Sequence, residues 1–174
     1  MPEQVLANLR KGHARADVFT ALAACRAAGL TLRPSLVAFT PWTTLEDYLE
    51  LFDFVADENL YDAVDPVQLT VRLLVPPGSG LLAHNAIRPF LGPLDPAAFS
   101  YRWTHPDPRM DALHARSSAL VRDATARGAA AAETIARLWD LARAARGTAP
   151  RWRRDPEITV GHARSPRLTE PWFC

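Results

Sequence analysis

Apolar residues in the first part of the chain recur first at helical and then at strand-like spacing. Residues 15–28 repeat apolar side chains every three to four positions, and Gly29 follows the last of them, which predicts a helix with a glycine stop. Residues 30–39 form a short apolar run that Pro41 closes, and such a run favours a buried strand over a helix.

The next helix is predicted from its capping residues. A capping box pairs a threonine with an acidic residue three positions later, and two registers fit, Thr44 with Asp47 or Thr43 with Glu46. A broad apolar stripe follows, with acidic residues over much of the remaining surface, and it ends near Asn59. We therefore expect an amphipathic helix that begins at these threonines.

A second strand is predicted over residues 67–75, which alternate and then become continuously apolar before Pro76, Pro77 and Gly78 stop the run. Helix, strand, helix, strand is the order of a parallel sheet with right-handed crossovers, so the predicted fold class is α/β. Two apolar strands alone leave long unpaired edges. Further strands must come from elsewhere, or the chain associates with itself through an exposed sheet edge.

The second half of the chain has a different pattern. Prolines divide residues 83–107 into turns and irregular pieces, and Asp107 and Pro108 then suit the start of a helix that is interrupted near Gly128. A second helical stretch ends at Gly147. We expect three parts: late strands and helices in 1–82, a proline-rich connection and helical extension in 83–149, and an extended tail in 150–174.

Composition narrows the classes of protein. The chain has 174 residues, of which 48% are hydrophobic and 22% charged, and its formal net charge is +1. These values predict a globular protein in the cytoplasm with no nucleic-acid or membrane partner. The two cysteines, Cys25 and Cys174, lack metal-site spacing, and the histidines are not clustered. His13 immediately precedes a helix, so local capping is its expected role.

Three blocks, in this order, resemble the late barrel of radical-SAM enzymes, including relatives of oxygen-independent coproporphyrinogen dehydrogenases. The first leads into the glycine-stopped helix, the second joins strand to helix, and the third is the last core strand with its proline-glycine exit. The blocks are KGHARAD at 11–17, FTPWTTLED at 39–47 and VQLTVRLLVPPGS at 67–79.

The C-terminus resembles a narrower group within that superfamily. Residues 168–174, LTEPWFC, are similar to the approach to the tail of the CUAEP/CCAEP-tail radical SAM (seleno)protein group, which continues Cys-Sec-Ala-Glu-Pro or Cys-Cys-Ala-Glu-Pro. The resemblance implies that a selenocysteine codon follows Cys174 and that Met1 is an internal start. Cys174 would then be a catalytic redox thiol, whereas alone it is an inert chain end.

The resemblance implies the C-terminal part of a radical-SAM partial (β/α) barrel, followed by a helical extension. The parent enzyme would use S-adenosylmethionine (SAM) and a [4Fe-4S] cluster for radical chemistry on a small-molecule or peptide substrate that no motif identifies. The C-x-x-x-C-x-x-C loop that binds such a cluster is absent here. We therefore expect the isolated chain to hold neither cofactor and to be inactive. The alternative is a small α/β binding or regulatory module that docks a partner through its exposed sheet edge.

Five further residues are candidate cofactor-binding residues. Phe39, Thr40 and Pro41 end the first predicted strand, at an edge that faces SAM in the family, although they also suit a stiff turn. Arg72 interrupts the second apolar strand, and Gln68 shares its face. Arg72 must find an anionic partner: either a substrate carboxylate or, more commonly, a carboxylate on an adjacent helix.

Overall fold

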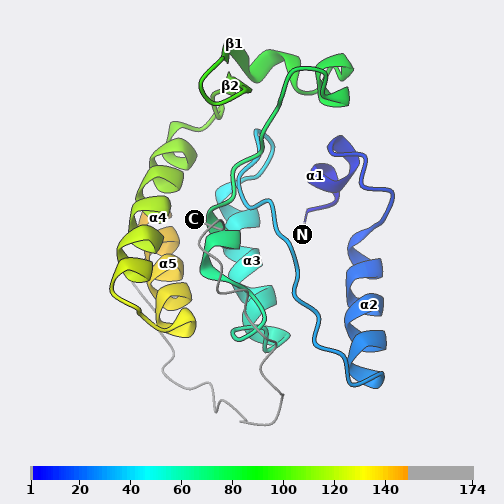
Figure 1. The fold of residues 1–174 in the computed structure, drawn as a ribbon, viewed down its shortest axis with the longest axis vertical. Coiled ribbons are helices and arrows are strands. Elements are labelled where there is room, and N and C mark those ends of the chain that lie inside the picture. Colours follow the sequence, from blue (N-terminus) through cyan, green and yellow to red (C-terminus); the bar gives the residue numbers. More distant parts are fainter. Residues whose placement is uncertain (1, 149–174) are drawn as a thin grey trace.

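The computed structural model describes residues 2–148, which form helices and one small sheet (Figure 1). The mixed helix and strand content agrees with the coarse prediction, and the helices expected from the sequence are present. The helices are α1 (Glu3–Asn8), α2 (Arg15–Ala27), α3 (Leu45–Asp57), α4 (Pro108–Ala126) and α5 (Ala131–Ala145). None of the helices in this part of the chain combines the length and the apolar character needed to cross a membrane.

Local chemistry sets the ends of the predicted helices. Gly29 follows α2 with a φ of +66°, a left-handed conformation that glycine adopts without strain. At the start of α3, Thr44 Oγ1 accepts from the Asp47 N–H at 3.1 Å, and Asp47 Oδ2 accepts from the Thr44 N–H at 2.9 Å. Of the two possible capping boxes, the chain therefore uses the one that starts at Thr44.

The two predicted strands are wrong over most of their length. Residues 30–39 are extended but unpaired until Phe39, which makes one isolated parallel bridge with Arg72. The second run begins with a 3₁₀-helix, η1 (Pro66–Thr70), whose first turn Asp65 caps by accepting from the Val67 N–H at 3.3 Å. Proline suits such a first turn and donates no N–H to a ladder.

A β-hairpin occupies part of the region that the prolines predicted to be only turns. Strands β1 (Leu91–Asp95) and β2 (Ser100–Trp103) pair antiparallel, after two 3₁₀-helices, η2 (Gly80–Ala83) and η3 (Arg88–Phe90). The hairpin was missed because its strands are short and β1 contains Pro93, which usually argues against a strand. The Tyr101 N–H also donates to the Val75 carbonyl at 2.8 Å, which ties the hairpin to the extended segment before it.

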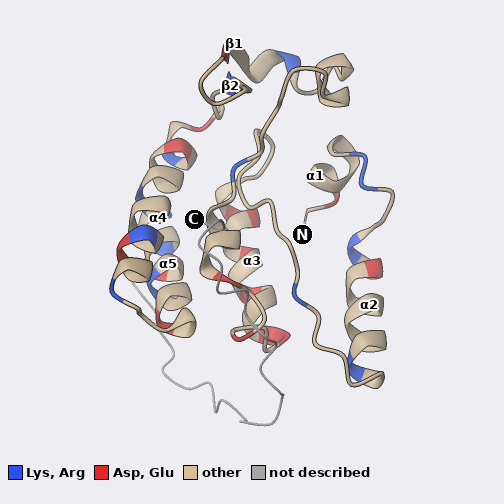
Figure 2. Cartoon of the chain, viewed as in Figure 1, with Lys and Arg blue, Asp and Glu red and all other residues tan. Residues whose placement is uncertain are grey.

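Helix α3 lies at the centre of the core. Helices α4 and α5 pack against each other, and α5 packs against α3 (Figure 1). Acidic residues gather on α3, whereas α4 and α5 carry both signs of charge (Figure 2). The core draws on both 1–82 and 83–149, and its fully buried side chains include Tyr48, Phe52, Val55, Leu69, Met110, Leu113, Ile135 and Leu138.

Candidate functional site

The bridge between Phe39 and Arg72 brings two of the candidate residues together. The Phe39 N–H donates to the Val71 carbonyl at 3.0 Å, and the Leu73 N–H donates to the Phe39 carbonyl at 2.8 Å. The chain between the two sides of the bridge contains α3, as a parallel connection requires. The Phe39 ring is 2% exposed and packs against His114, with the ring centroids 5.0 Å apart. The site is therefore one parallel bridge whose two sides are joined through α3.

Arg72 is held by groups from the second half of the chain. Its Nη1 donates to Asp111 Oδ1 at 2.7 Å, and its Nη2 donates to the Trp103 carbonyl at 2.8 Å. The guanidinium carbon lies 3.6 Å from the centroid of the Trp103 ring, which is a cation–π contact. Of the two anionic partners expected for Arg72, the structure shows the carboxylate on a neighbouring helix, Asp111 of α4. Both terminal nitrogens of Arg72 make hydrogen bonds within the chain.

Asp111 extends this cluster to His105. Its second oxygen, Oδ2, accepts from the His105 N–H at 3.0 Å. The His105 ring is buried, with Nε2 3.0 Å from the Thr43 carbonyl and Nδ1 2.9 Å from the Asp107 N–H. Since a carbonyl can only accept, Nε2 is the donor in the contact with Thr43, while Nδ1 lies beside both the Asp107 N–H and, at 3.0 Å, the Asp107 carbonyl. The imidazole thus joins the start of α3 to the start of α4.

Thr40 and Pro41 form a buried turn. Thr40 is 0% exposed, and its Oγ1 lies 2.8 Å from Thr43 Oγ1. The Trp42 N–H donates to Thr40 Oγ1 at 3.3 Å. The polar side chain at this strand end is therefore satisfied within the turn, as expected of a turn that sets chain geometry.

Gln68 lies in η1, apart from the Arg72 cluster. Its Oε1 accepts from the Leu36 N–H at 2.9 Å and from Ser35 Oγ at 3.4 Å. The amide oxygen therefore fastens the first extended segment to η1.

His114 lies beside the bridge on α4. Burial lowers the pKa of its half-buried imidazole, and the nearby positive charge of Arg72 lowers it further. Its Nε2 is 3.3 Å from Ser118 Oγ. Both effects disfavour the charged form of the ring, at a position where a second positive charge would face Arg72.

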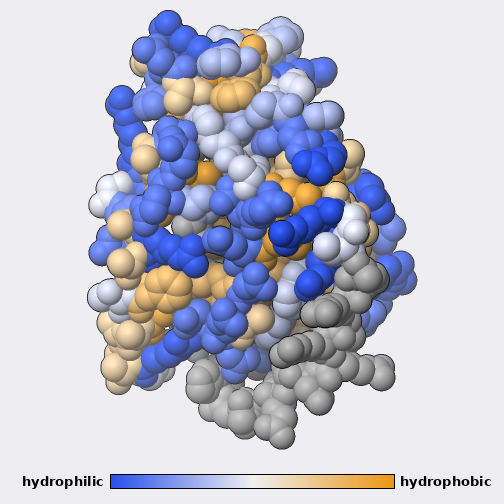
Figure 3. Space-filling view, turned by 180° about the vertical axis from the view of Figure 1, so that it is seen from behind, coloured by the Kyte–Doolittle hydropathy of each residue, from blue (hydrophilic) through white to orange (hydrophobic). Residues whose placement is uncertain are grey.

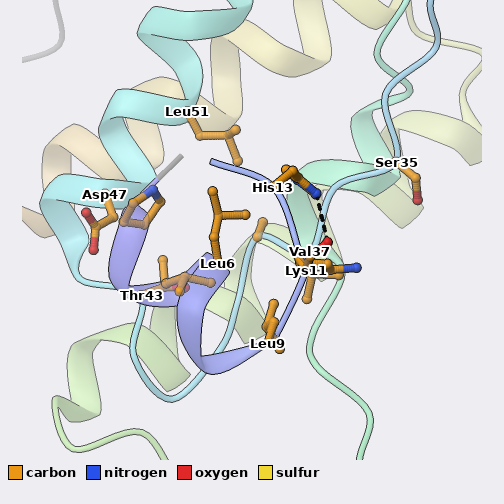
Figure 4. A pocket seen from close by; sticks show the side chains of 12 residues that line it. Leu6, Leu9, Lys11, His13, Ser35, Val37, Thr43, Asp47 and Leu51 are labelled. Carbon is orange, nitrogen blue, oxygen red and sulfur yellow. Dashed lines mark hydrogen bonds between the residues drawn. The ribbon is translucent and has the colours of Figure 1, made fainter. Parts of the chain in front are cut away.

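A hollow of about 110 Å³ lies between α1, the extended residues 35–38 and the start of α3 (Figure 4). Its volume is of the order of a cavity that holds one benzene ring, and much smaller than SAM. The lining is mostly apolar, with polar groups that include Lys11, His13 and Asp47. The prediction that His13 caps α2 is wrong, because its Nδ1 lies 3.1 Å from the Lys11 carbonyl. The cap is formed instead by Asp17, whose carboxylate accepts from the Ala14 N–H.

A smaller hollow, of about 90 Å³, lies between α3 and the end of α5. Arg143 lines it, and its Nε is buried without a hydrogen-bond partner. Asp53 lies on the opposite side, and burial raises the pKa of its carboxyl.

The described residues do not fit a [4Fe-4S] cluster. Between residues 2 and 148 no three His, Cys, Asp or Glu side chains are grouped as metal ligands. Cys25 is the one cysteine in that range, and such a cluster needs several thiolates. Cys174 lies outside the described residues. Thr40 Oγ1, Gln68 Oε1 and the two terminal nitrogens of Arg72 make hydrogen bonds within the chain.

No protein-family model, curated protein or solved structure matches the chain.

Sequence reasoning missed the residues that complete the cluster. Trp103 and Asp111 lie 31 and 39 positions beyond Arg72, and His105 lies 62 positions beyond Thr43. No local spacing in the sequence connects these residues. The one available signal was Arg72 itself, because a charge in an apolar run requires a partner.

Proposed function

We propose that this chain is the C-terminal part of a radical-SAM enzyme and contributes a late βαβ unit of the barrel together with a helical extension. The observation that carries the proposal is the parallel bridge between Phe39 and Arg72 across α3. Parallel pairing with a helical crossover is the repeating unit of such barrels. The three sequence blocks that resemble the family fall on α2, on the turn into α3 and on the Arg72 segment.

The role of the described residues in this proposal is structural. Arg72, Asp111 and His105 join the bridge to the helical extension, so α4 is fixed against the strand ends. The described residues do not fit the cluster, and we assign them no chemical step. SAM and cluster binding are left to polypeptide outside residues 2–148.

The test begins with the genomic DNA upstream of Met1. The proposal expects an open frame that encodes a strand followed by C-x-x-x-C-x-x-C. The extended protein should then be produced anaerobically, reconstituted with iron and sulfide, and assayed for cleavage of SAM to 5′-deoxyadenosine. The 174-residue chain, treated identically, is the matched control and should give no product. An upstream frame without the cysteine motif would overturn the proposal.

The second candidate function is a small binding module that docks a partner chain. It is favoured by the extended residues 34–38, whose N–H and C=O groups pair with no strand of the described chain and which Ser35 and Leu36 fasten to Gln68. This candidate takes precedence if the cysteine motif is absent and the purified chain binds no SAM.

A further inference from the structure

The 90 Å³ hollow between α3 and the end of α5 is lined by two opposite charges that do not meet. The Arg143 guanidinium donates no hydrogen bond to residues 2–148, and its Nε is buried without a partner. Asp53, on the other side, forms neither a hydrogen bond nor an ion pair with the same residues. A buried donor without an acceptor costs free energy, so a further polar group in this hollow would be favourable.

The α3 side of the hollow is acidic. Glu50, Asp53 and Asp57 are exposed at intervals of three and four residues, which places them on one face of the helix (Figure 2). Burial raises the pKa of the Asp53 carboxyl, and the charges of Asp57 and Glu50 raise it further, whereas the charge of Arg143 lowers it. A cation beside Asp53 would therefore be attracted by several carboxylates, and an anion would be favoured only at Arg143.

The described part of the chain ends at this hollow. Thr148 is its last residue and belongs to the lining. The sequence continues APRWRRDPE over 149–157, in which three arginines precede an aspartate. Five residues of extended chain span up to about 17 Å, so Arg153 can reach Asp53 from Thr148. The nearest chain outside the described residues thus supplies both signs of charge that the hollow lacks.

The spacing of the charges in this segment fits the hollow. Arg153 and Asp155 are two positions apart, so in an extended chain their side chains point to the same side, about 7 Å from each other. Pro156 disfavours a helical conformation of the residue before it, which favours the extended form at Asp155. Arginine and carboxylate pair through two parallel hydrogen bonds, so each of these two side chains can complement one charge of the hollow.

We propose that residues 151–155 of this chain dock in the 90 Å³ hollow, with Arg153 paired to Asp53 and Asp155 paired to Arg143. The inference goes beyond the proposed function and does not depend on it. Exposed ion pairs contribute little individually, but a short linker raises the effective concentration of the docked segment to the millimolar range. Docking should therefore be an intramolecular contact that salt weakens.

The test exchanges charges between the two sides. In the unaltered chain, the heteronuclear ¹H–¹⁵N NOE, which reports order on the picosecond to nanosecond scale, should be higher at 151–155 than at 160–165. Asp53→Lys or Arg153→Asp alone should lower the NOE at 151–155 to that of 160–165. The two substitutions together should restore it, because the pair is reformed with its signs reversed. Arg164→Asp, the same charge change further along, is the matched control and should have no effect.

The second pair is tested in the same way, with Arg143→Glu, Asp155→Lys and their combination. Raising salt from about 0.01 M to about 1 M, which shortens the screening length from about 30 Å to about 3 Å, should also lower the NOE at 151–155. If a substitution in α3 or α5 changes the helical circular dichroism, the single substitutions at Arg153 and Asp155 still test the proposal, since these residues lie outside the described fold. An equal NOE at 151–155 and 160–165 in the unaltered chain, or combined variants that stay as mobile as the single ones, overturns the proposal.

Discussion

The helical layer of α3, α4 and α5 and the two extended segments, 30–39 and 71–75, both contribute buried apolar side chains, but only the helices form regular secondary structure. The helices satisfy their backbone groups internally, so burial of one apolar stripe is sufficient. The extended segments need partners elsewhere for their N–H and C=O groups, and among the described residues their strand-like pairing is limited to the Phe39–Arg72 bridge and the hydrogen bond from Tyr101 to Val75. Apolar content therefore indicated burial in both regions, but regular structure only in the helices.

The two regions also differ in how far their large apolar side chains are exposed. On the face opposite to that of Figure 1, apolar areas lie between hydrophilic ones (Figure 3). Leu30 and Leu74, which lie in the extended segments, are 64% and 69% exposed, whereas Leu138 on α5 is 0% exposed. Large apolar side chains therefore remain exposed in the extended segments, as Phe99 does in the hairpin turn at 70%.

The largest expected effect is in the helical layer. Leu138→Ala should lower the free energy of unfolding by about 3 kcal/mol, because it removes a fully buried side chain and leaves a cavity. Leu74→Ala is the matched control in the extended region and should change it by under about 0.5 kcal/mol. Urea denaturation followed by circular dichroism measures both. A larger loss at Leu74 than at Leu138 would reverse the comparison.

The next largest loss of stability is expected at the ion pair between Arg72 and Asp111, which links the extended segment to α4. Asp111→Asn should destabilise the chain by about 1–2 kcal/mol, because Arg72 loses its charged partner and stays one-quarter exposed. Asp95→Asn, which breaks the more exposed pair with Arg102, is the control and should have little effect. Equal stability of the two variants in urea would show that the cluster does not hold the bridge to α4.

A smaller change in the free energy of unfolding, this time an increase, is expected for a substitution of Ser117. Its hydroxyl is 0% exposed and meets only the Tyr48 hydroxyl, whose own proton goes to the Leu69 carbonyl, so Ser117→Ala removes a poorly paired polar group from the core. The variant should gain about 0.5–1 kcal/mol in urea denaturation. Ser118→Ala, which loses the contact with His114, should not gain stability. A destabilised Ser117→Ala chain would mean that the hydroxyl does have a partner in solution.

The smallest effect is a pH dependence beside the bridge. The pKa of His114 is lowered from 6.5 by burial, so the unfolded chain binds this proton more readily than the folded one. Stability should therefore fall as the pH drops below about 6.5 toward the lower folded pKa. Thermal unfolding midpoints across this range should fall less steeply in His114→Gln. An unchanged slope would rule out His114 as the group responsible.

The sequence by itself determined the features that depend on neighbouring residues. The glycine stop at Gly29, the threonine start of α3 and the helix that begins with Asp107 and Pro108 all follow from hydrogen bonds within a few positions. The turn at Thr40 belongs to the same class. The helices could be predicted because their hydrogen bonds close within the segment.

Only the tertiary structure decided the features that join distant residues. Whether residues 30–39 and 71–75 form strands depends on neighbours that the described chain does not supply, so the apolar pattern could not determine the outcome. The partners of Arg72, and the Thr43 carbonyl that His105 Nε2 contacts, likewise lie more than 30 positions away. Strands and buried charges obtain their hydrogen bonds across the fold, and the sequence pattern shows the need for a partner without showing which residue meets it.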